Sequence, residues 1–264
     1  MSFRVLKAFP NVLHIQDEMG TCMTLLLGTK SALLLDTGYG LTNVRAQMQQ
    51  YTHLPLFVVL THGHHDHALG ARWFQHVRLF PQDFTCYVQY TAPASQARVQ
   101  AQARAKGLNV DFGAFPPRAP VQALQAGWLD LGNFAVYMSP CPGHTPGSAV
   151  AYVPRYKLLI TGDSWNPCTW LFFPEALNIW QYRQSIRRLL SFPFEWVLCS
   201  HQHKLFPRAC LEAFVQGLTD ACITHAPRIR MQGWDTLTLL RATPASGQEI
   251  IFDGQKAQSL RLGL

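Results

Sequence analysis

Short apolar runs separated by turn residues fill the first third of the chain and predict a series of strands. Four such runs, at 3–9, 11–16, 22–29 and 31–38, are broken by Pro, Gly and Asn. An unbroken apolar run at 56–62 is typical of a strand that is buried on both faces. Between these strands, apolar residues recur at intervals of four and three over 42–51, which predicts a helix. Another helix is expected from about Ala68.

The middle of the chain changes from strand patterns to helix patterns before strands return. Residues 95–107 contain strong helix formers and end in Gly107, which predicts a helix with a glycine cap. Because strand patterns resume at 128–140, we expect a helical insertion or lid at about 81–120, inside a single domain that spans residues 1–264. Further strands are predicted at 148–154, 156–163 and 194–201, with an amphipathic helix at 178–192, a helix near 207–219 and two or three short strands to the end.

The composition describes a well-packed and modestly basic protein. Hydrophobic residues make up 48% of the 264 positions and charged residues only 14%, below the roughly 25% of typical soluble domains, which favours a compact body over disorder. The net charge of +7 permits acidic partners without requiring one. No apolar stretch approaches the length of a membrane span and the first residues lack a secretory signal, so we expect a cytoplasmic protein without a membrane partner. The seven cysteines include no CxxC pair, which is typical of reduced thiols.

Histidine and aspartate gather where several predicted strands end. The run THGHHDHALG at 61–70 holds four histidines and one aspartate within six positions, directly after the buried strand. With the residues that follow other strands, the candidate ligands are His62, His64, Asp66, His67, His144, Asp163 and His201. Neutral imidazole and carboxylate suit Zn, Fe, Mn or Ni. A lone histidine at a strand end is ordinarily a turn residue, but this density predicts a metal site, and the number of ligands suits two adjacent ions.

Five short motifs resemble, in their order and spacing, those of the metallo-β-lactamase superfamily. They are LLLDTG at 33–38, HGHHDH at 62–67, GHTPGS at 143–148, TGDS at 161–164 and CSH at 199–201. The likeness covers about residues 12–205. It implies an α/β fold of four layers, the αβ/βα sandwich, in which two mixed sheets lie face to face with helices outside. The metals of that fold lie in a cleft at one edge of the sheets.

The resemblance also implies a role for each candidate ligand. His62, His64 and His144 would hold a first metal, Asp66, His67 and His201 would hold a second, and Asp163 would bridge the two. Asp36 in the first motif would support the site by orienting ligands. The implied cofactors are two divalent metal ions, with zinc as the leading candidate and iron or manganese as alternatives. The bridging aspartate and the sequence PGHTPGS resemble most the glyoxalase II and lactonase-like members, although no glutathione-binding helical pair is recognisable.

A binuclear metal-dependent hydrolase with a small-molecule substrate is the function that the resemblance implies. A metal-bridged hydroxide would attack an ester, thioester or lactone, and Asp66 would be the catalytic residue that orients the hydroxide and passes its proton to the leaving group. A phosphodiesterase or nuclease of the same superfamily is an alternative, but the missing RNA-processing insertion argues against a nucleic-acid partner. Two further alternatives stay open: a non-catalytic metal- or ligand-binding protein, and a sulfur dioxygenase that uses one iron.

The aromatic residues that follow Asp163 leave two interpretations open. Trp165, Trp170, Phe172 and Phe173 can form a wall of the substrate pocket, or they can pack a sheet against a helix. Three arginines on the helix at 178–192 are more typical of a solvated face than of an anion-binding patch. Cys141 and Cys168 are expected to be buried, unreactive thiols, and His65 is expected to point away from the ligands.

Overall fold

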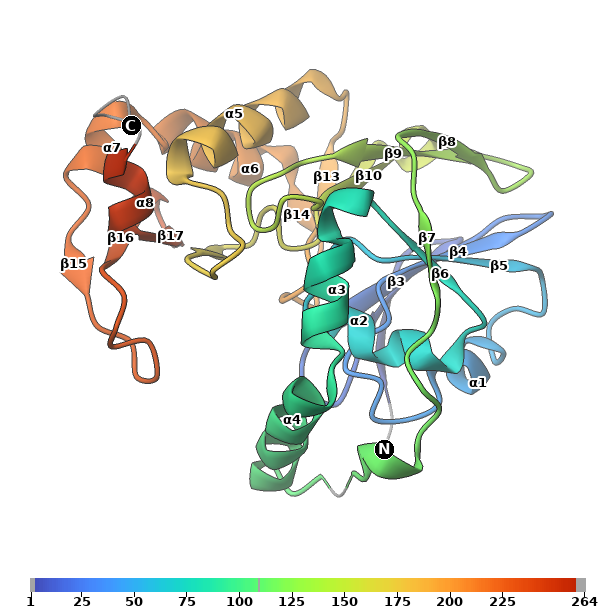
Figure 1. Cartoon of the computed structure of the whole chain (residues 1–264). Helices are drawn as coiled ribbons and strands as arrows, with labels where there is room; N and C mark the ends of the chain where they lie inside the picture. Colours follow the sequence, from blue (N-terminus) through green and yellow to red (C-terminus); the bar gives the residue numbers. More distant parts are fainter. Residues whose placement is uncertain (1–2, 109, 260–264) are drawn as a thin grey trace.

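The computed structural model describes residues 3–108 and 110–259, and the strands of its N-terminal half pair as one seven-stranded sheet (Figure 1). In sheet order these are β1 (Arg4–Phe9), β2 (Val12–Gln16), β3 (Cys22–Leu27), β4 (Ala32–Leu35), β5 (Leu56–Val59), β6 (Val77–Leu79) and β7 (Val121–Ala123). The pairs from β1 to β4 are antiparallel and those from β4 to β7 are parallel, so the sheet is mixed. The unbroken apolar run forms β5, in the interior of the sheet as predicted.

A second sheet of six strands is built from the middle and later parts of the chain. Its order is β14 (Phe206–Pro207), β13 (Trp196–Leu198), β11 (Leu158–Ile160), β10 (Ala149–Val153), β9 (Ala135–Pro140) and β8 (Gly127–Asp130). Its neighbouring strands are antiparallel except β11 and β13, which pair in parallel. The second sheet is therefore mixed as well.

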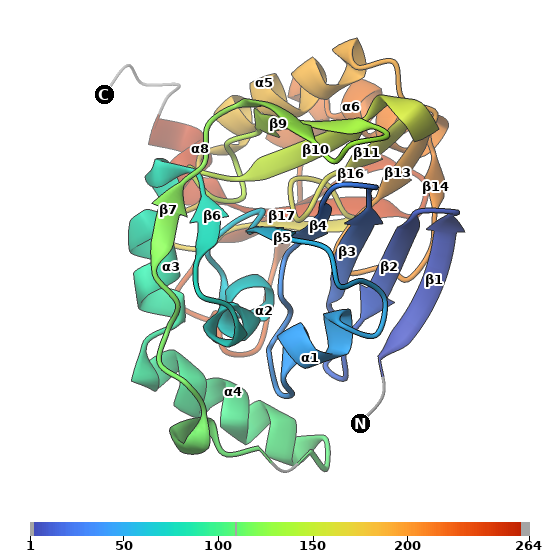
Figure 2. The same ribbon diagram turned by 90° about the vertical axis from the view of Figure 1, so that its right-hand side faces the viewer.

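The two sheets pack face to face, and helices cover both outer faces (Figure 2). Between the sheets, Leu33 and Val59 of the first share one core with Val136 and Leu158 of the second. Outside the first sheet lie α1 (Val44–Met48) and α2 (His65–Ala68), and outside the second lie α5 (Ile179–Arg188) and α6 (Arg208–Gly217). Burial of these apolar faces is the main force that holds the layers together. The predicted four-layer sandwich is confirmed.

A third, smaller sheet joins the short strands predicted near the end of the chain to one strand, β12 (Cys168–Leu171), that the sequence pattern does not predict. Its order is β12, β17 (Gln248–Asp253), β16 (Leu239–Ala245) and β15 (Arg228–Ile229). β12 comes from the aromatic segment after Asp163, and it pairs in parallel with β17 from near the end of the chain. Helices α7 (Asp220–Thr224) and α8 (Gly254–Ser259) belong to the same C-terminal part. The third sheet thus joins the segment after a candidate ligand to the last strands of the protein.

The predicted helical segment at 81–120 contains two consecutive helices, α3 (Phe84–Tyr90) and α4 (Pro93–Ala105). α4 has a proline in its first turn, where the missing N–H costs nothing, and it is followed by Gly107 with φ of +76°. The predicted glycine at the helix end is confirmed, and that the segment moves as a lid stays a prediction. Neither these helices nor the others within residues 3–108 and 110–259 are long and apolar enough to cross a membrane.

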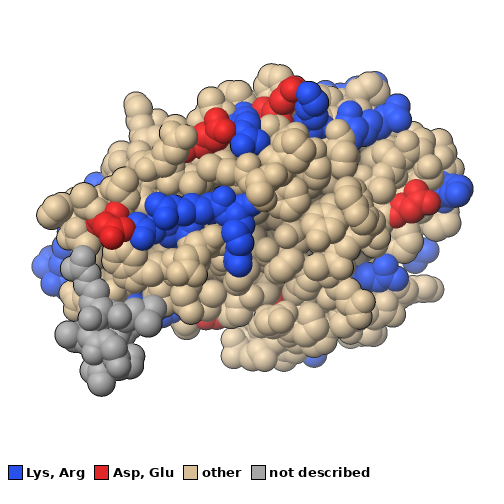
Figure 3. All heavy atoms as spheres, turned by 90° about the horizontal axis from the view of Figure 1, so that it is seen from above, with Lys and Arg blue, Asp and Glu red and all other residues tan. Residues whose placement is uncertain are grey.

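Lys and Arg side chains gather on the face that carries α5 and α6 (Figure 3). Arg183 of α5 forms an ion pair with Asp220, and Arg188 donates a hydrogen bond to Ser185 one turn earlier. Arg187 of the same helix is exposed. Asp220 and the exposed Arg187 lie on the surface, in agreement with a solvated basic face.

The contact between α6 and β16 generates a prediction about stability. A Cβ atom on Gly217, the last residue of α6, would lie 1.7 Å from the carbonyl oxygen of Pro244 in β16. We expect Gly217→Ala to lower the free energy of unfolding by about 2 kcal/mol, because the backbone must shift to relieve the overlap. Urea denaturation measures the change, and Gln216→Ala, at an exposed neighbouring position, is the control that should leave stability almost unchanged. Equal stabilities of the two variants would contradict the prediction.

Candidate metal centre

The carboxyl ends of strands from both sheets deliver the candidate ligands to one place. They follow the strands in this way: His62 and His64 come after β5, His144 lies between β9 and β10, Asp163 follows β11 and His201 follows β13. α2 begins at His65, three residues before its predicted start, which places Asp66 and His67 in its only turn. Because α2 starts at His65, the helix geometry sets the directions in which Asp66 and His67 point relative to β5.

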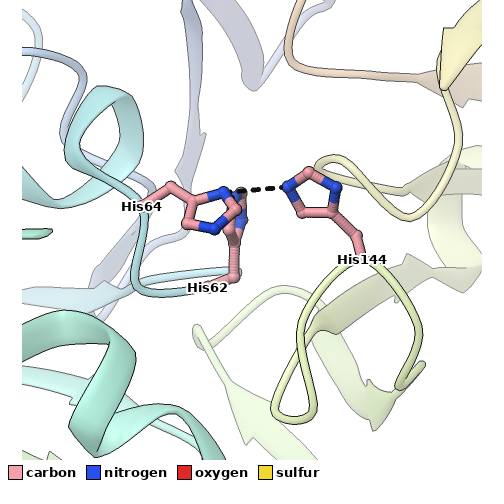
Figure 4. Close-up of side chains that lie close together, drawn as sticks. All are labelled: His62, His64 and His144. Carbon is pink, nitrogen blue, oxygen red and sulfur yellow. Dashed lines mark hydrogen bonds between the residues drawn. The ribbon is translucent and has the colours of Figure 1, made fainter. Parts of the chain in front are cut away.

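Three imidazoles meet in the first group of the centre (Figure 4). The rings of His62 and His64, which come from one loop, face the ring of His144 from another loop. Nε2 of His62 lies 3.1 Å from Nδ1 of His64, and Nε2 of His144 lies 2.9 Å from the same atom. All three side chains are buried. The three nitrogens can therefore face one ion.

Two imidazoles and two carboxylates form the second group, beside the first. Nε2 of His67 lies 3.5 Å from an oxygen of Asp66 and 3.5 Å from an oxygen of Asp163. Nε2 of His201 lies 3.0 Å from Oδ2 of Asp163 and 3.5 Å from Oδ2 of Asp66. Oδ2 of Asp163 is also 3.6 Å from Nε2 of His144, so this carboxylate lies between the two groups. The structure thus brings all seven candidate ligands together.

Burial favours the neutral form of His62 and His144 in the first group. It lowers the pKa of His144 to about 4 and, with the nearby histidines, the pKa of His62 well below its usual value. In the second group, burial alone would lower the pKa of His67 and raise that of Asp163. Neighbouring charges outweigh this effect: Asp66 and other carboxylates raise the pKa of His67, and His201 and His67 hold the pKa of Asp163 well below its usual range. Ionised carboxylates and neutral imidazoles are the forms that bind divalent cations, so a cation bound in the second group would displace a proton from His67.

One buried atom of the second group lacks a partner in the part of the chain that the structure describes. Nε2 of His67 is enclosed by protein and makes no hydrogen bond there. Leaving such an atom unsatisfied costs about 1–3 kcal/mol. A cation held by the second group would accept its lone pair, so both the donor set and this nitrogen fit a metal ion.

The ring nitrogens that face away from the centre are held by hydrogen bonds. A carboxylate oxygen of Asp36 lies 2.9 Å from Nδ1 of His67, and the same side chain accepts hydrogen bonds from the backbone N–H and the hydroxyl of Thr61. Asp36 has φ of +63°, which is rare outside glycine and costs on the order of 1–3 kcal/mol. Nδ1 of His144 donates to the carbonyl oxygen of Trp170 at 2.7 Å. The geometry around Asp36 is the one that its predicted support role requires.

Asp83 ties together the two loops of the first group, and no motif marks it in the sequence. Its carboxylate is fully buried and accepts hydrogen bonds from the N–H of Gly63 at 2.9 Å and from the hydroxyl of Thr145 at 2.8 Å. A third bond, of 2.7 Å, comes from the N–H of Gly147. Since Gly63 lies between two of the histidines and Thr145 follows the third, one side chain sets the distance between the loops.

A cavity of about 580 Å³ opens beside the two groups. Its wall includes several of the ligands together with five aromatic residues, Tyr39, Tyr90, Trp170, Phe173 and Trp234. His65 also lines it, with its ring 5.5 Å from that of Tyr39 and 5.8 Å from that of Tyr90, and it belongs to neither group of ligands, in agreement with the expected non-ligand role. The two tyrosines and Trp234 were not predicted, because they reach the cavity from segments without a motif.

Two of the four predicted pocket aromatics lie in the core instead. Trp165 is fully buried, and its indole N–H donates to the side chain of Gln248. Phe172 is buried against Leu239 and Ile251 of the third sheet. For these two rings the packing alternative is correct, because residues near the end of the chain, including Gln248 and Ile251 of β17, pack against them. Trp170 and Phe173 lie at the cavity wall, as predicted.

The two cysteines near the ligands differ in exposure. Cys141 is buried, as expected, and burial raises its pKa to about 11. Cys168 is exposed and lines the cavity, so its expected burial is wrong. Its thiol donates to a carboxylate oxygen of Glu249 at 3.1 Å, and partial burial together with this bond raises its pKa to about 11. Both thiols are therefore protonated near neutral pH.

Comparison with known proteins places this centre in a family context. A family model described as the metallo-beta-lactamase superfamily matches residues 18–201. The acyl-coenzyme A thioesterase MBLAC2 of Gallus gallus is 26% identical to this chain over an alignment of 182 residues that covers 63% of this chain. The match spans 65% of the length of that relative, slightly less than two thirds.

Solved structures share the fold at lower sequence identity. A metallo-beta-lactamase from Pontibacter korlensis superposes with a TM-score of 0.58 at 18% identity, over 83% of this chain and 100% of that one. TTHA1623 in a di-iron-bound form gives a TM-score of 0.56 at 25% identity, over 75% and 94% of the two chains. The sec-alkylsulfatase Pisa1 from Pseudomonas sp. gives 0.64 at 19% identity, over 84% of this chain and 42% of that one.

The three hydrogen bonds of Asp83 generate a prediction. Asp83→Ala leaves two buried N–H groups without an acceptor and removes one of the two hydrogen-bond partners of the Thr145 hydroxyl, and we expect the free energy of unfolding to fall by about 3 kcal/mol or more. Chemical denaturation of the metal-free protein measures this loss. Asp130→Ala is the matched control, because Asp130 accepts one hydrogen bond in an exposed turn, from the N–H of Gly132. A loss no larger in Asp83→Ala than in this control would refute the bridging role.

Proposed function

This chain belongs to the metallo-β-lactamase superfamily, and from that premise we propose that it is a binuclear metal-dependent hydrolase of small acyl thioesters and related esters. The predicted family, fold and broad class of metallo-β-lactamase-fold hydrolase are confirmed. The number and identity of the metal ions, the residues that bind them and the substrate are parts of the proposal. The observation that carries it is the convergence of seven ligand side chains at the wall of an aromatic cavity.

Two groups of ligands support two divalent ions. In the proposal the three histidines of the first group would hold one ion, the second group would hold the other, and Asp163, which lies between the groups, would contribute to both. TTHA1623, which is 25% identical to this chain, is described in a di-iron-bound form, and this supports a binuclear centre. Zinc remains our leading candidate, with iron or manganese as alternatives. Such ions, when bound, lower the pKa of water toward neutrality and polarise the acceptor oxygen of the substrate.

Asp66 is the residue to which we assign proton transfer. It lines the cavity, and its Oδ2 atom lies 3.5 Å from Nε2 of both His67 and His201. Burial alone would raise its pKa, but His67 and two other histidines lower it below its usual value, so the carboxylate is ionised. An ionised oxygen at this position can accept a proton from the attacking water and return it to the leaving group.

The cavity favours an apolar acyl group. Trp170, Phe173 and Trp234 supply aromatic surface, and none of the described residues that line the cavity is a lysine or an arginine. A phosphate-rich segment would therefore find no cationic side chain inside, which argues against a nucleic-acid substrate. The relative MBLAC2 is named as an acyl-coenzyme A thioesterase, and this supports a thioester substrate for this chain. In such a substrate the acyl group would enter the cavity while the charged carrier stays outside.

Removal of metal is the first test of the proposal. We expect the protein, loaded with zinc, to hydrolyse acyl-coenzyme A or p-nitrophenyl esters, to lose this activity with a chelator and to regain it when zinc is restored. Asp66→Ala should lower kcat by about 100-fold or more, because general acid–base catalysis contributes at least that factor. The metal content of each variant is measured in parallel, and Asp130→Ala is the control that should stay active. Undiminished turnover in Asp66→Ala, or in metal-free protein, would overturn the assignment.

The apolar wall generates a second prediction. Trp170 is only partly exposed (39%), and its ring lies at the cavity wall. We expect Trp170→Ala to lower kcat/KM about tenfold for a long or aromatic acyl thioester, since the lost apolar contact is worth about 1.4 kcal/mol. The loss should be smaller for an acetyl thioester, which fills less of the cavity. Trp128→Ala, at a 60% exposed tryptophan on β8, is the control. If Trp170→Ala lowers kcat/KM equally for the long acyl thioester and the acetyl thioester, the cavity does not bind the acyl group.

A further inference from the structure

His64 uses both of its ring nitrogens, and the partner of the second comes from outside the ligand motifs. Nδ1 faces the other two histidines of the first group, as Figure 4 shows. Nε2, on the opposite side of the ring, is hydrogen-bonded to a carboxylate oxygen of Glu175. Glu175 lies between β12 and α5, in a segment that carries none of the predicted ligands. A carboxylate thus stands behind one of the three candidate ligands of the first ion.

The surroundings of His64 and Glu175 hold this pair in one arrangement. The ring of His64 packs between Tyr90 and Phe173, with centroid distances of 4.5 Å and 4.7 Å. Only 4% of the His64 side chain and 17% of the Glu175 side chain are exposed. The hydrogen bond is therefore shielded from water, where charge-assisted bonds are strongest.

A lysine from the C-terminal helix α8 fixes the segment that carries Glu175. Nζ of Lys256 donates to the carbonyl oxygens of Phe173, Pro174 and Ala176, at 2.9, 2.8 and 2.8 Å. These residues flank Glu175 on both sides. α8 lies beyond residues 18–201, which the family model matches, so a part of the chain outside that match reaches the centre through one loop.

We propose that Glu175 is a positioning residue for the first metal position, and that Lys256 sets the place of Glu175. A carboxylate that accepts the Nε2–H of His64 keeps the ring proton on that nitrogen and leaves Nδ1 with its lone pair toward the ligand group. It also makes the imidazole a stronger donor and prevents the ring from turning. This inference rests on the metal-binding part of the proposed function and on none of its statements about substrate.

The test measures how tightly each variant holds metal. Wild-type protein, Glu175→Ala, Glu175→Gln and Lys256→Met are loaded with zinc and titrated with a chelator, and the zinc retained per chain is counted. We expect Glu175→Ala to release one of its two ions at a free-zinc level 10- to 100-fold higher than wild type, while the other ion is held as in wild type. Glu175→Gln should release this ion at a free-zinc level between those of wild type and Glu175→Ala, because its amide oxygen still accepts the hydrogen bond from His64 but carries no charge. Lys256→Met should also raise the free-zinc level at which this ion is released, but by a smaller factor than Glu175→Ala.

Two controls separate this role from a general loss of structure. Glu249→Gln changes another carboxylate near the cavity, one that hydrogen-bonds Cys168 and no candidate ligand, and Lys157→Met changes an exposed lysine that pairs with Glu195. Both should release zinc as wild type does. The melting temperature of each metal-free variant is recorded, and if Glu175→Ala does not fold, the isosteric Glu175→Gln decides.

The outcomes are distinct. If the folded Glu175 variants release zinc as wild type does, the positioning role is wrong. This holds even if the melting temperature of the metal-free variants is lowered. A wild-type protein that binds no zinc, iron or manganese would overturn both this inference and the proposed metal-dependent hydrolase.

Discussion

Four imidazoles of the candidate metal centre are each held by a hydrogen bond at the nitrogen that faces away from the centre, and the rest of the site depends on these bonds. Nδ1 of His62 is bonded to Thr61, Nδ1 of His67 to Asp36, Nδ1 of His144 to the carbonyl of Trp170 and Nε2 of His64 to Glu175. With the outward nitrogen engaged, the inward one is left to face the other ligands. Buried imidazoles would otherwise turn toward any available partner, because an unsatisfied polar atom in the core is costly.

The candidate ligands themselves could be predicted from the sequence, whereas most of the groups that hydrogen-bond their outward-facing nitrogens could not. The candidate ligands occupy short runs at strand ends, and the number of histidines at 62–67 distinguishes them from ordinary turn residues. Asp36 also stands in a motif. By contrast, Glu175 and Asp83 are single carboxylates in segments without a pattern, and the partner of His144 is a backbone carbonyl, which every residue possesses. Such contacts depend on how distant segments pack, which local sequence does not encode.

The dependence on contacts between distant segments also explains which parts of the fold could be predicted from the sequence. Apolar runs and helix periodicity are local properties, and they predict most strands of the two large sheets and the helices α4, α5 and α6 close to where the structure has them, whereas the arrangement of the strands in two sheets is implied by the family resemblance. β12 is stabilised by parallel pairing with β17, and this pairing involves residues that are far apart in the chain. Since β12 determines which neighbouring aromatic rings are covered, the missing strand also explains why Trp165 and Phe172 could not be told from Trp170 and Phe173.

The C-terminal part of the chain therefore has two separable effects on the centre. The candidate ligands all lie within the matched residues 18–201, whereas Trp234 of the cavity wall and Lys256 behind the Glu175 loop lie beyond them. Trp234 packs edge-to-face on Phe173, the residue whose carbonyl Lys256 binds and whose ring touches His64. One short loop thus transmits contacts from the C-terminal part both to the cavity and to a ligand. Under the proposed function, changes in that part of the chain would alter both the shape of the cavity and the position of His64 without any change in the ligands themselves.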